Sequence, residues 1–196
     1  MGDIKSAREI AMEKVAKLDE VTKEERLKWK YEPEGEKLAT RYTKEDCNLV
    51  TELSQYEEKA RKYVVDGIIG VLSRNISIPK NNLAKKANQK AMDGIKTLKK
   101  DKIAVENVFS KIRRVFDHYG DQGEQQRKQA YQQLKTEFTE KIQQAMQQQL
   151  GSFPTVEIAV ERQPQFQEEW QRLQTQLDLQ YVRLLNEYKQ ELLNIS

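Results

Sequence analysis

The chain has 196 residues, of which 37% are hydrophobic and 33% are charged, with 8 Gly, 4 Pro and a single Cys. This scarcity of turn residues disfavours β-sandwiches and barrels and favours long helices with narrow apolar stripes. One Cys excludes an intramolecular disulfide framework and a Cys-cluster metal site, and no apolar run approaches the roughly 20 residues of a membrane span. The charged N-terminus lacks an apolar leader segment, so we predict a cytoplasmic protein.

The first 31 residues predict a short amphipathic helix followed by a connector. Residues 4–18 place five apolar side chains at helical spacing, namely Ile4, Ala7, Ala11, Val15 and Leu18. Thr22 and Glu25 have the spacing of a capping box, which predicts one helical turn after Thr22. The residue before a proline avoids the α region, so we expect an extended connector up to Pro33 and a second helix that starts there.

Residues 34–73 predict one long helix with a coiled-coil-like seam. Tyr42, Leu49, Tyr56 and Tyr63 recur every seven residues. The end of this helix, residues 64–72, is apolar nearly all round and must therefore be covered on several sides. We predict its large side chains to belong to a core or a subunit interface, the candidates being Val64, Ile68, Val71 and Leu72.

A break at residues 75–80 separates this helix from a third one, predicted over 82–117. The alternation around Ile76 and Ile78 is typical of a short strand or an extended connector. An antiparallel hairpin would bring 64–72 opposite residues 84–93, which are rich in Ala and Lys. We therefore expect 64–72 to pack against the C-terminal helices or the 151–163 connector, where Phe153, Val156, Ile158 and Val160 supply the bulk.

The Gln-rich remainder, 119–196, predicts a second helical hairpin. A turn at 118–123 leads into a helix over 124–150, and a last helix is expected over 165–194. The last helix repeats Trp170, Leu177 and Leu184 every seven residues, and these three are further candidates for a core or an interface. Residues 155–161 alternate in the manner of a strand. The fold class is thus mainly all-α: elongated long-helix hairpins or a coiled-coil-like bundle, with a possible tiny β element near 76–78 and 156–160. The predicted domains are 1–31, 32–118 and 119–196, although one continuous domain is an alternative.

The charge distribution marks residues 80–118, which carry 11 basic and 4 acidic side chains. On one helix four lysines would cluster on a common side: Lys85, Lys96, Lys99 and Lys102. Such a basic patch could neutralise phosphates of a nucleic acid or an anionic surface. The patch lacks the aromatic side chains on which bases stack, and a solvated face that complements an acidic partner helix is the stronger interpretation.

No set of residues predicts catalysis, a metal site or a cofactor. His118 has no suitably spaced partner, and its place at a predicted helix C-terminus favours an interaction with the terminal carbonyls. Cys47 follows two acidic residues, which would raise its pKa and disfavour a nucleophilic role. Phosphate-loop, hydrolase-elbow and metalloprotease motifs do not occur. We therefore predict a protein that is not an enzyme and that binds no cofactor.

Residues 3–11 and 25–38 resemble hypothetical bacterial all-helical proteins of unknown function, and this resemblance implies no activity. The helix–strand–helix order of 124–194 is loosely similar to a prefoldin subunit, which implies a holding chaperone, although one candidate strand stands where that family has hairpins. The long apolar stripes favour a non-catalytic helical scaffold, adaptor or assembly component. The predicted partner is a protein, either a second copy or another helical protein, and binding of nucleic acid or an anionic surface is the alternative.

Overall fold

The computed structural model describes residues 22–45, 47–150 and 159–195, and all regular structure in these residues is helical. The all-α prediction is confirmed. By packing, the chain forms two compact units. Unit 1 comprises the chain up to Ile76 together with Gln89–Lys100, and unit 2 comprises Ser77–Asn88 and Asp101–Ser196. The division passes through one helix and differs from the predicted boundaries after residues 31 and 118. In the described part of the chain, no helix is long and apolar enough to cross a membrane.

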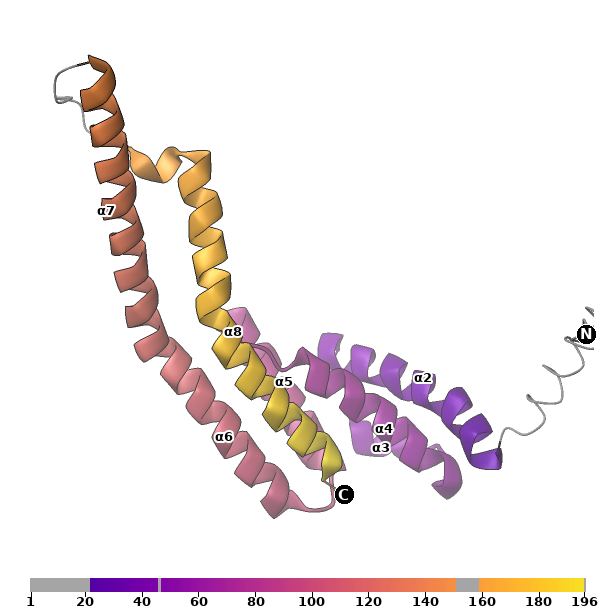
Figure 1. Ribbon diagram of the computed structural model, residues 1–196. Helices are drawn as coiled ribbons and strands as arrows, with labels where there is room; N and C mark the ends of the chain where they lie inside the picture. Colours follow the sequence, from indigo (N-terminus) through magenta and orange to yellow (C-terminus); the bar gives the residue numbers. More distant parts are fainter. Residues whose placement is uncertain (1–21, 46, 151–158, 196) are drawn as a thin grey trace, which may run out of the picture. The chain divides into compact units, whose positions relative to one another are not determined.

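Unit 1 is built on two helices that pack along each other, α2 (Lys23–Lys44) and α4 (Glu58–Asn75), which lie side by side in Figure 1. The predicted capping box starts α2: the Glu25 amide donates to Thr22 Oγ1 at 3.2 Å, and the Thr22 amide donates to Glu25 Oε2 at 2.9 Å. The helix then continues far beyond the expected single turn. Pro33 lies inside α2 and does not begin a new helix. Packing against α4 therefore outweighs the hydrogen bond that proline cannot make.

Two glycines set the closeness of this packing. A Cβ on Gly35 of α2 would lie 2.1 Å from the carbonyl oxygen of Val64, and a Cβ on Gly67 of α4 would lie 2.2 Å from that of Glu32. The backbones of the two helices thus touch at a reciprocal pair of glycines. Gly67 thus permits the close approach of the α2 backbone. Gly70, three residues further along α4, has nothing within 4 Å of its Cβ position.

The predicted 34–73 helix is wrong, because the chain breaks twice within it. Between α2 and α4 lies a short helix, α3 (Leu49–Ser54), whose first amides are capped by the Asn48 side chain. Asn48 Oδ1 accepts from the Val50 amide at 2.9 Å, which offers the backbone an alternative to continued helix. Tyr42, Leu49 and Tyr63 accordingly lie on three different helices, so the heptad seam does not exist.

Elements of unit 1 cover the buried side chains of residues 64–72, where we expected the C-terminal helices or the 151–163 connector. Val64, Ile68 and Leu72 are fully buried within unit 1, where α2 covers them. The second half of α5 (Asn82–Leu98) closes the other side. A Cβ on Gly94 would lie 2.7 Å from Leu72 Cδ1 and 2.9 Å from Tyr42 Cε1. Small residues on α5 thus admit large ones from α2 and α4. Phe153, Val156 and Ile158, which we expected there, lie outside the described residues.

The predicted 82–117 helix is also divided, into α5 and α6 (Lys102–Gly120). Asp101 ends the continuity because its Oδ1 accepts from the Ala104 amide at 2.9 Å and caps a new helix. Before α5, residues 76–80 have no regular secondary structure, and no strand occurs in the described chain. Asn88 takes the place of a pairing strand: its side chain accepts from the Ser77 amide at 2.9 Å and donates to the Ser77 carbonyl at 2.6 Å.

Unit 2 is a helical hairpin in which α6 and α7 (Gln122–Leu150) run along α8 (Pro164–Asn194), as Figure 1 shows. Only Asp121 separates α6 from α7. A short 3-10 helix, η1 (Val160–Arg162), precedes α8 and buries Val160. Of the possible β element at 156–160, residues 156–158 lie outside the described residues. Pro164 occupies the first position of α8, where its missing amide costs nothing. Unit 2 buries apolar residues of α6 and of the C-terminal half of α8, and a separate cluster of Leu134, Val160 and Phe166.

Candidate functional site

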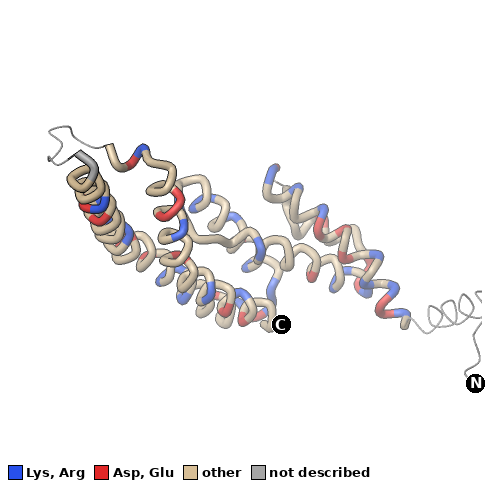
Figure 2. Tube along the Cα trace, turned by 45° about the horizontal axis from the view of Figure 1, so that its top comes forward, with Lys and Arg blue, Asp and Glu red and all other residues tan. Residues whose placement is uncertain are grey.

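The four lysines of the predicted basic patch do not share one exposed helical face. Lys85 and Lys96 lie on α5, Lys99 follows its end, and Lys102 begins α6. Lys96 and Lys99 belong to unit 1, whereas the other two belong to unit 2. Lys99 is only 9% exposed, and this burial lowers its pKa. Figure 2 shows basic and acidic positions distributed over several helices.

The remaining predicted residues fall into two groups. Val64, Ile68 and Leu72 are buried in unit 1, and Val71 is half-buried. On α8, Trp170 and Leu177 are half-buried and Leu184 is 38% exposed. His118 lies in the last turn of α6 as predicted, but its Nδ1 is 3.0 Å from the Tyr181 hydroxyl rather than on terminal carbonyls. Cys47 is half-buried between α2 and α3.

A polar cluster centred on the buried Asp178 joins all parts of unit 2, and the sequence analysis missed it. Asp178 on α8 is 8% exposed, and its Oδ2 accepts from Lys80 Nζ at 2.7 Å. Arg127 on α7 places Nη1 3.9 Å from Asp178 Oδ1 and donates from Nη2 to the Tyr119 carbonyl at 3.2 Å. The Arg127 guanidinium also lies 4.1 Å from the centre of the Tyr119 ring. We call Lys80, Tyr119, Arg127 and Asp178 the polar cluster.

Hydrogen bonding and burial shift two pKa values within the polar cluster. The hydrogen bond to Asp178 raises the pKa of Lys80, and burial raises the pKa of the Tyr119 hydroxyl. Two buried atoms, Arg127 Nη1 and Asp178 Oδ1, have no hydrogen-bond partner. At 3.9 Å they attract each other electrostatically but are too far apart for a hydrogen bond. The cluster therefore ties residues 77–88 and α7 to α8, with the single carboxylate of Asp178 placed between the cations of Lys80 and Arg127.

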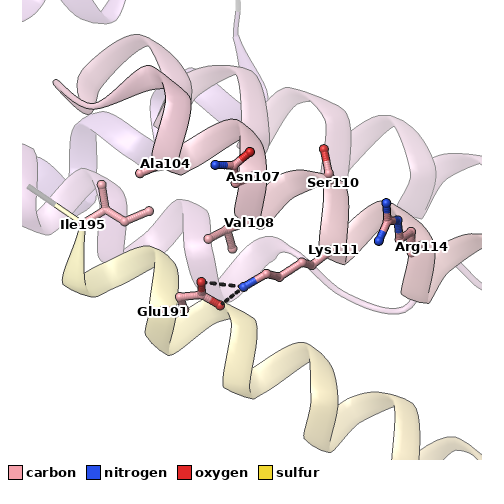
Figure 3. Close-up of a pocket in the computed structure, with 8 residues that line it drawn as sticks. All are labelled: Ala104, Asn107, Val108, Ser110, Lys111, Arg114, Glu191 and Ile195. Atoms are coloured by element: carbon pink, nitrogen blue, oxygen red, sulfur yellow. Dashed lines mark hydrogen bonds and ion pairs between the residues drawn. The ribbon is translucent and has the colours of Figure 1, made fainter.

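A surface groove of about 530 Å³ lies between α6 and the C-terminal end of α8 (Figure 3). Eight residues line it: Ala104, Asn107, Val108, Ser110, Lys111 and Arg114 from α6, and Glu191 and Ile195 at the end of α8. Lys111 reaches across to Glu191, with its Nζ 2.7 and 2.9 Å from the two carboxylate oxygens. The same ammonium lies 5.6 Å from the centre of the Tyr188 ring.

The helical repeat explains how this groove acquires a polar wall. Positions 104, 107, 111 and 114 follow one side of α6 at steps of three and four, and Figure 3 shows their side chains in a row. The adjacent side of α6 carries the buried residues Val105, Ile112 and Val115, which face the core. The groove is open, and its polar wall carries hydrogen-bond donors from Asn107, Ser110 and Arg114.

Beyond the polar cluster, α7 and α8 form a two-helix arm held by aromatic side chains. Phe166 packs edge-on against Tyr131 and Phe138, with ring centres 5.5 and 5.4 Å apart, and Tyr131 meets Trp170 at 5.1 Å. Leu134 and Val160 complete the buried centre. Several large apolar residues of the arm stay half-buried: Tyr131, Phe138, Ile142, Met146, Trp170, Leu173 and Leu177. We call these residues the arm seam.

In the described residues, no group of three or more His, Cys, Asp or Glu side chains is placed to hold a metal ion. Comparison with protein families shows that residues 50–194 match DUF6657, a family of unknown function. The chain belongs to this family. The DUF6657 match includes the groove, the polar cluster and the arm, but it leaves out α2. No curated protein and no solved structure matches the chain.

Proposed function

We propose that this protein is a non-catalytic helical adaptor whose α7–α8 arm binds a helical segment of another protein. The observation that carries the proposal is the arm seam. Two helices share one apolar stripe, and each seam residue is only half-buried. A third helix laid along the seam would complete a bundle and bury these side chains fully.

The contrast in burial between α6 and α7 supports this interpretation. In α6, six residues of nineteen are buried: Val105, Val108, Phe109, Ile112, Val115 and Tyr119. In the described part of α7, Leu134 is the only large apolar residue that is buried. The arm seam residues beyond it, Phe138, Ile142 and Met146, are half-buried. A helix this long is not stabilised by propensity alone. We therefore expect its apolar stripe to pack against a partner.

Aromatic content adds to the argument. Trp, Tyr and Phe are enriched at the centres of protein interfaces because they bury a large area with few rotatable bonds. The seam carries Tyr131, Phe138 and Trp170, which are already oriented by edge-on contacts with one another or with Phe166. Such preorganisation lowers the entropic cost of binding. Polyanion binding is less well supported, because Lys99 is buried and the four predicted lysines are divided between the two units.

Photo-crosslinking in the source cells tests this proposal. A benzoylphenylalanine at Phe138 or Ile142 should give a discrete crosslinked species, whereas the same group at the exposed neighbours Glu137 and Lys141 should not. Purified protein should be treated in parallel, because a crosslink there would identify a second copy of the chain as the partner. No crosslink from either seam position, in variants with unchanged helical content, would contradict the proposal.

A further inference from the structure

The groove between α6 and α8 has one positive charge that the protein does not balance. Of its three charged lining residues, Lys111 and Glu191 neutralise each other through a two-oxygen contact. Arg114 is exposed and forms no ion pair or hydrogen bond with any described residue. The neighbouring Arg113 differs, because it pairs with Glu106. The groove therefore presents a guanidinium whose bonding capacity is unused.

Polar donors accompany Arg114 on the same wall. Figure 3 shows Asn107 and Ser110 on α6 between Ala104 and Arg114. Ser110 Oγ accepts from Arg113 Nη2 at 3.2 Å, so its own hydrogen remains available to donate. The Asn107 amide is exposed and supplies two more N–H groups. A guanidinium beside amide and hydroxyl donors matches the needs of a carboxylate.

The opposite end of the groove is apolar. Ala104 and Ile195 line it, and Val108 forms its buried floor. Ten residues of α6 separate Ala104 from Arg114, which is about 15 Å at 1.5 Å per residue. A ligand that fills both ends must therefore carry an apolar group and a carboxylate about three helical turns apart.

We propose that this groove binds an acidic amphipathic helix of a partner protein, with an apolar side chain at Ala104 and Ile195 and a carboxylate at Arg114. A helix lying in a groove between two helices brings apolar and charged side chains to such spacings. Nucleic acid is a poorer match, because one uncompensated cation releases few counterions and the apolar end has no phosphate to meet. The groove lies apart from the arm seam, so this inference goes beyond the proposed function and does not depend on it.

Two designed peptides of roughly 18 residues, about five turns, are the probes. Both carry leucines in the first half of one face, and three turns later one peptide carries glutamates and the other lysines. Binding to the full chain is measured by fluorescence anisotropy at low and at high salt. Three variants are compared with the wild type: Arg114→Gln, Glu191→Gln and, as a control at an exposed residue of α8 that does not line the groove, Arg183→Gln. A labelled single-stranded oligonucleotide is run as a separate arm.

The two groove variants should have opposite effects on the acidic peptide. Arg114→Gln should weaken binding by about two- to fivefold, the range for exposed ion pairs. Glu191→Gln should strengthen binding by a similar factor, because it releases Lys111 to the ligand. Arg183→Gln should change nothing, and salt should weaken binding.

Absence of saturable binding, equal binding of the two peptides, or an unchanged affinity in Arg114→Gln would overturn the proposal. Oligonucleotide binding that Arg114→Gln removes, without peptide binding, would overturn it in favour of a phosphate ligand. Loss of crosslinks from Phe138 with normal peptide binding would refute the adaptor arm alone, so the two proposals fail separately.

Discussion

The close crossing of α2 and α4 makes a quantitative prediction for Gly67→Ala. The added Cβ would lie 2.2 Å from the Glu32 carbonyl oxygen and 3.1 Å from the Glu32 carbonyl carbon. Favourable carbon–oxygen contacts between helices are about 3.3–3.6 Å, so the helices must move apart by about 1 Å. The obstacle is backbone, and no side-chain rotation relieves it.

The expected cost follows from two opposing effects. Overpacking of a tight contact costs about 1–3 kcal/mol, and the better helix propensity of Ala returns about 1 kcal/mol. Because the clash is with backbone, we expect the upper part of the first range and a net loss of about 1–2 kcal/mol. For a cooperative unit of 60–100 residues each kcal/mol corresponds to about 4–8 °C in Tm. Urea and thermal unfolding followed by circular dichroism measure both quantities.

Gly70→Ala is the matched control, because it lies three residues away on the same helix with nothing within 4 Å of its Cβ position. It should stabilise the protein by about 0.5–1 kcal/mol through propensity alone. Gly35→Ala should behave like Gly67→Ala. The double variant should cost less than the sum, because one separation of the helices accommodates both methyl groups. If Gly67→Ala stabilised the protein as much as Gly70→Ala, the backbone contact between α2 and α4 would be refuted.

The polar cluster makes two further predictions, both measured by urea unfolding. Asp178→Asn should destabilise the protein by about 2–3 kcal/mol because it leaves Arg127 buried without its counter-charge. The exposed-pair variant Glu191→Gln should cost under about 1 kcal/mol, and equal losses would contradict the burial argument. The pKa values of Lys80, Tyr119 and Tyr181 are all raised, the first by Asp178 and the others by burial. A group whose pKa is raised in the folded state contributes fully to the free energy of unfolding at neutral pH. This contribution is lost as the pH rises through the folded pKa. The free energy of unfolding should therefore fall above about pH 10, and Lys80→Met should make this fall shallower; an unchanged slope would contradict the Lys80 contribution.

The helical class and the long C-terminal elements could be predicted because their signals are local. Pro164, the apolar steps of α7 and the capping box at Thr22 each act within a few residues. The breaks were missed because single side chains cause them. Asn48 and Asp101 cap new helices inside sequences whose apolar period continues across the break. The helix start predicted at Pro33 was wrong, because packing that only the tertiary structure reveals offsets the cost of a proline inside a helix.

The polar cluster and the groove could not be found by motif spacing. Lys80, Arg127 and Asp178 meet from three segments of the chain, and no short pattern connects them. One signal was present in the sequence. Asp178 lies among Leu177, Tyr181 and Leu185 on the apolar side of the predicted last helix, where a carboxylate needs a cation. Which cation pairs with the Asp178 carboxylate depends on the fold.

Residues 64–72 show how one wrong boundary changes an interpretation. Because a helix was predicted to begin at Pro33, the N-terminal part of α2 was not available to cover this segment. A distant connector or a subunit interface was therefore expected to cover it. The structure supplies α2 and the end of α5 instead, and the side chain of Ile68 is fully buried between elements of unit 1. An interface is not needed to explain its apolar character.

Ile68→Asp distinguishes a core from an interface. An unpaired carboxylate at a fully buried position costs several kcal/mol, which is comparable to the whole stability of a small unit. We expect the helical signal of α2 and α4 to be lost, whereas the near-ultraviolet signal of the Tyr131–Phe166–Trp170 cluster in unit 2 should persist. The exposed neighbour Asp66→Ala is the control and should leave both signals unchanged. A helical, fully folded Ile68→Asp monomer would show that residues 64–72 form a surface that a second subunit covers, because only a side chain that faces a partner can accept a charge once that partner is gone.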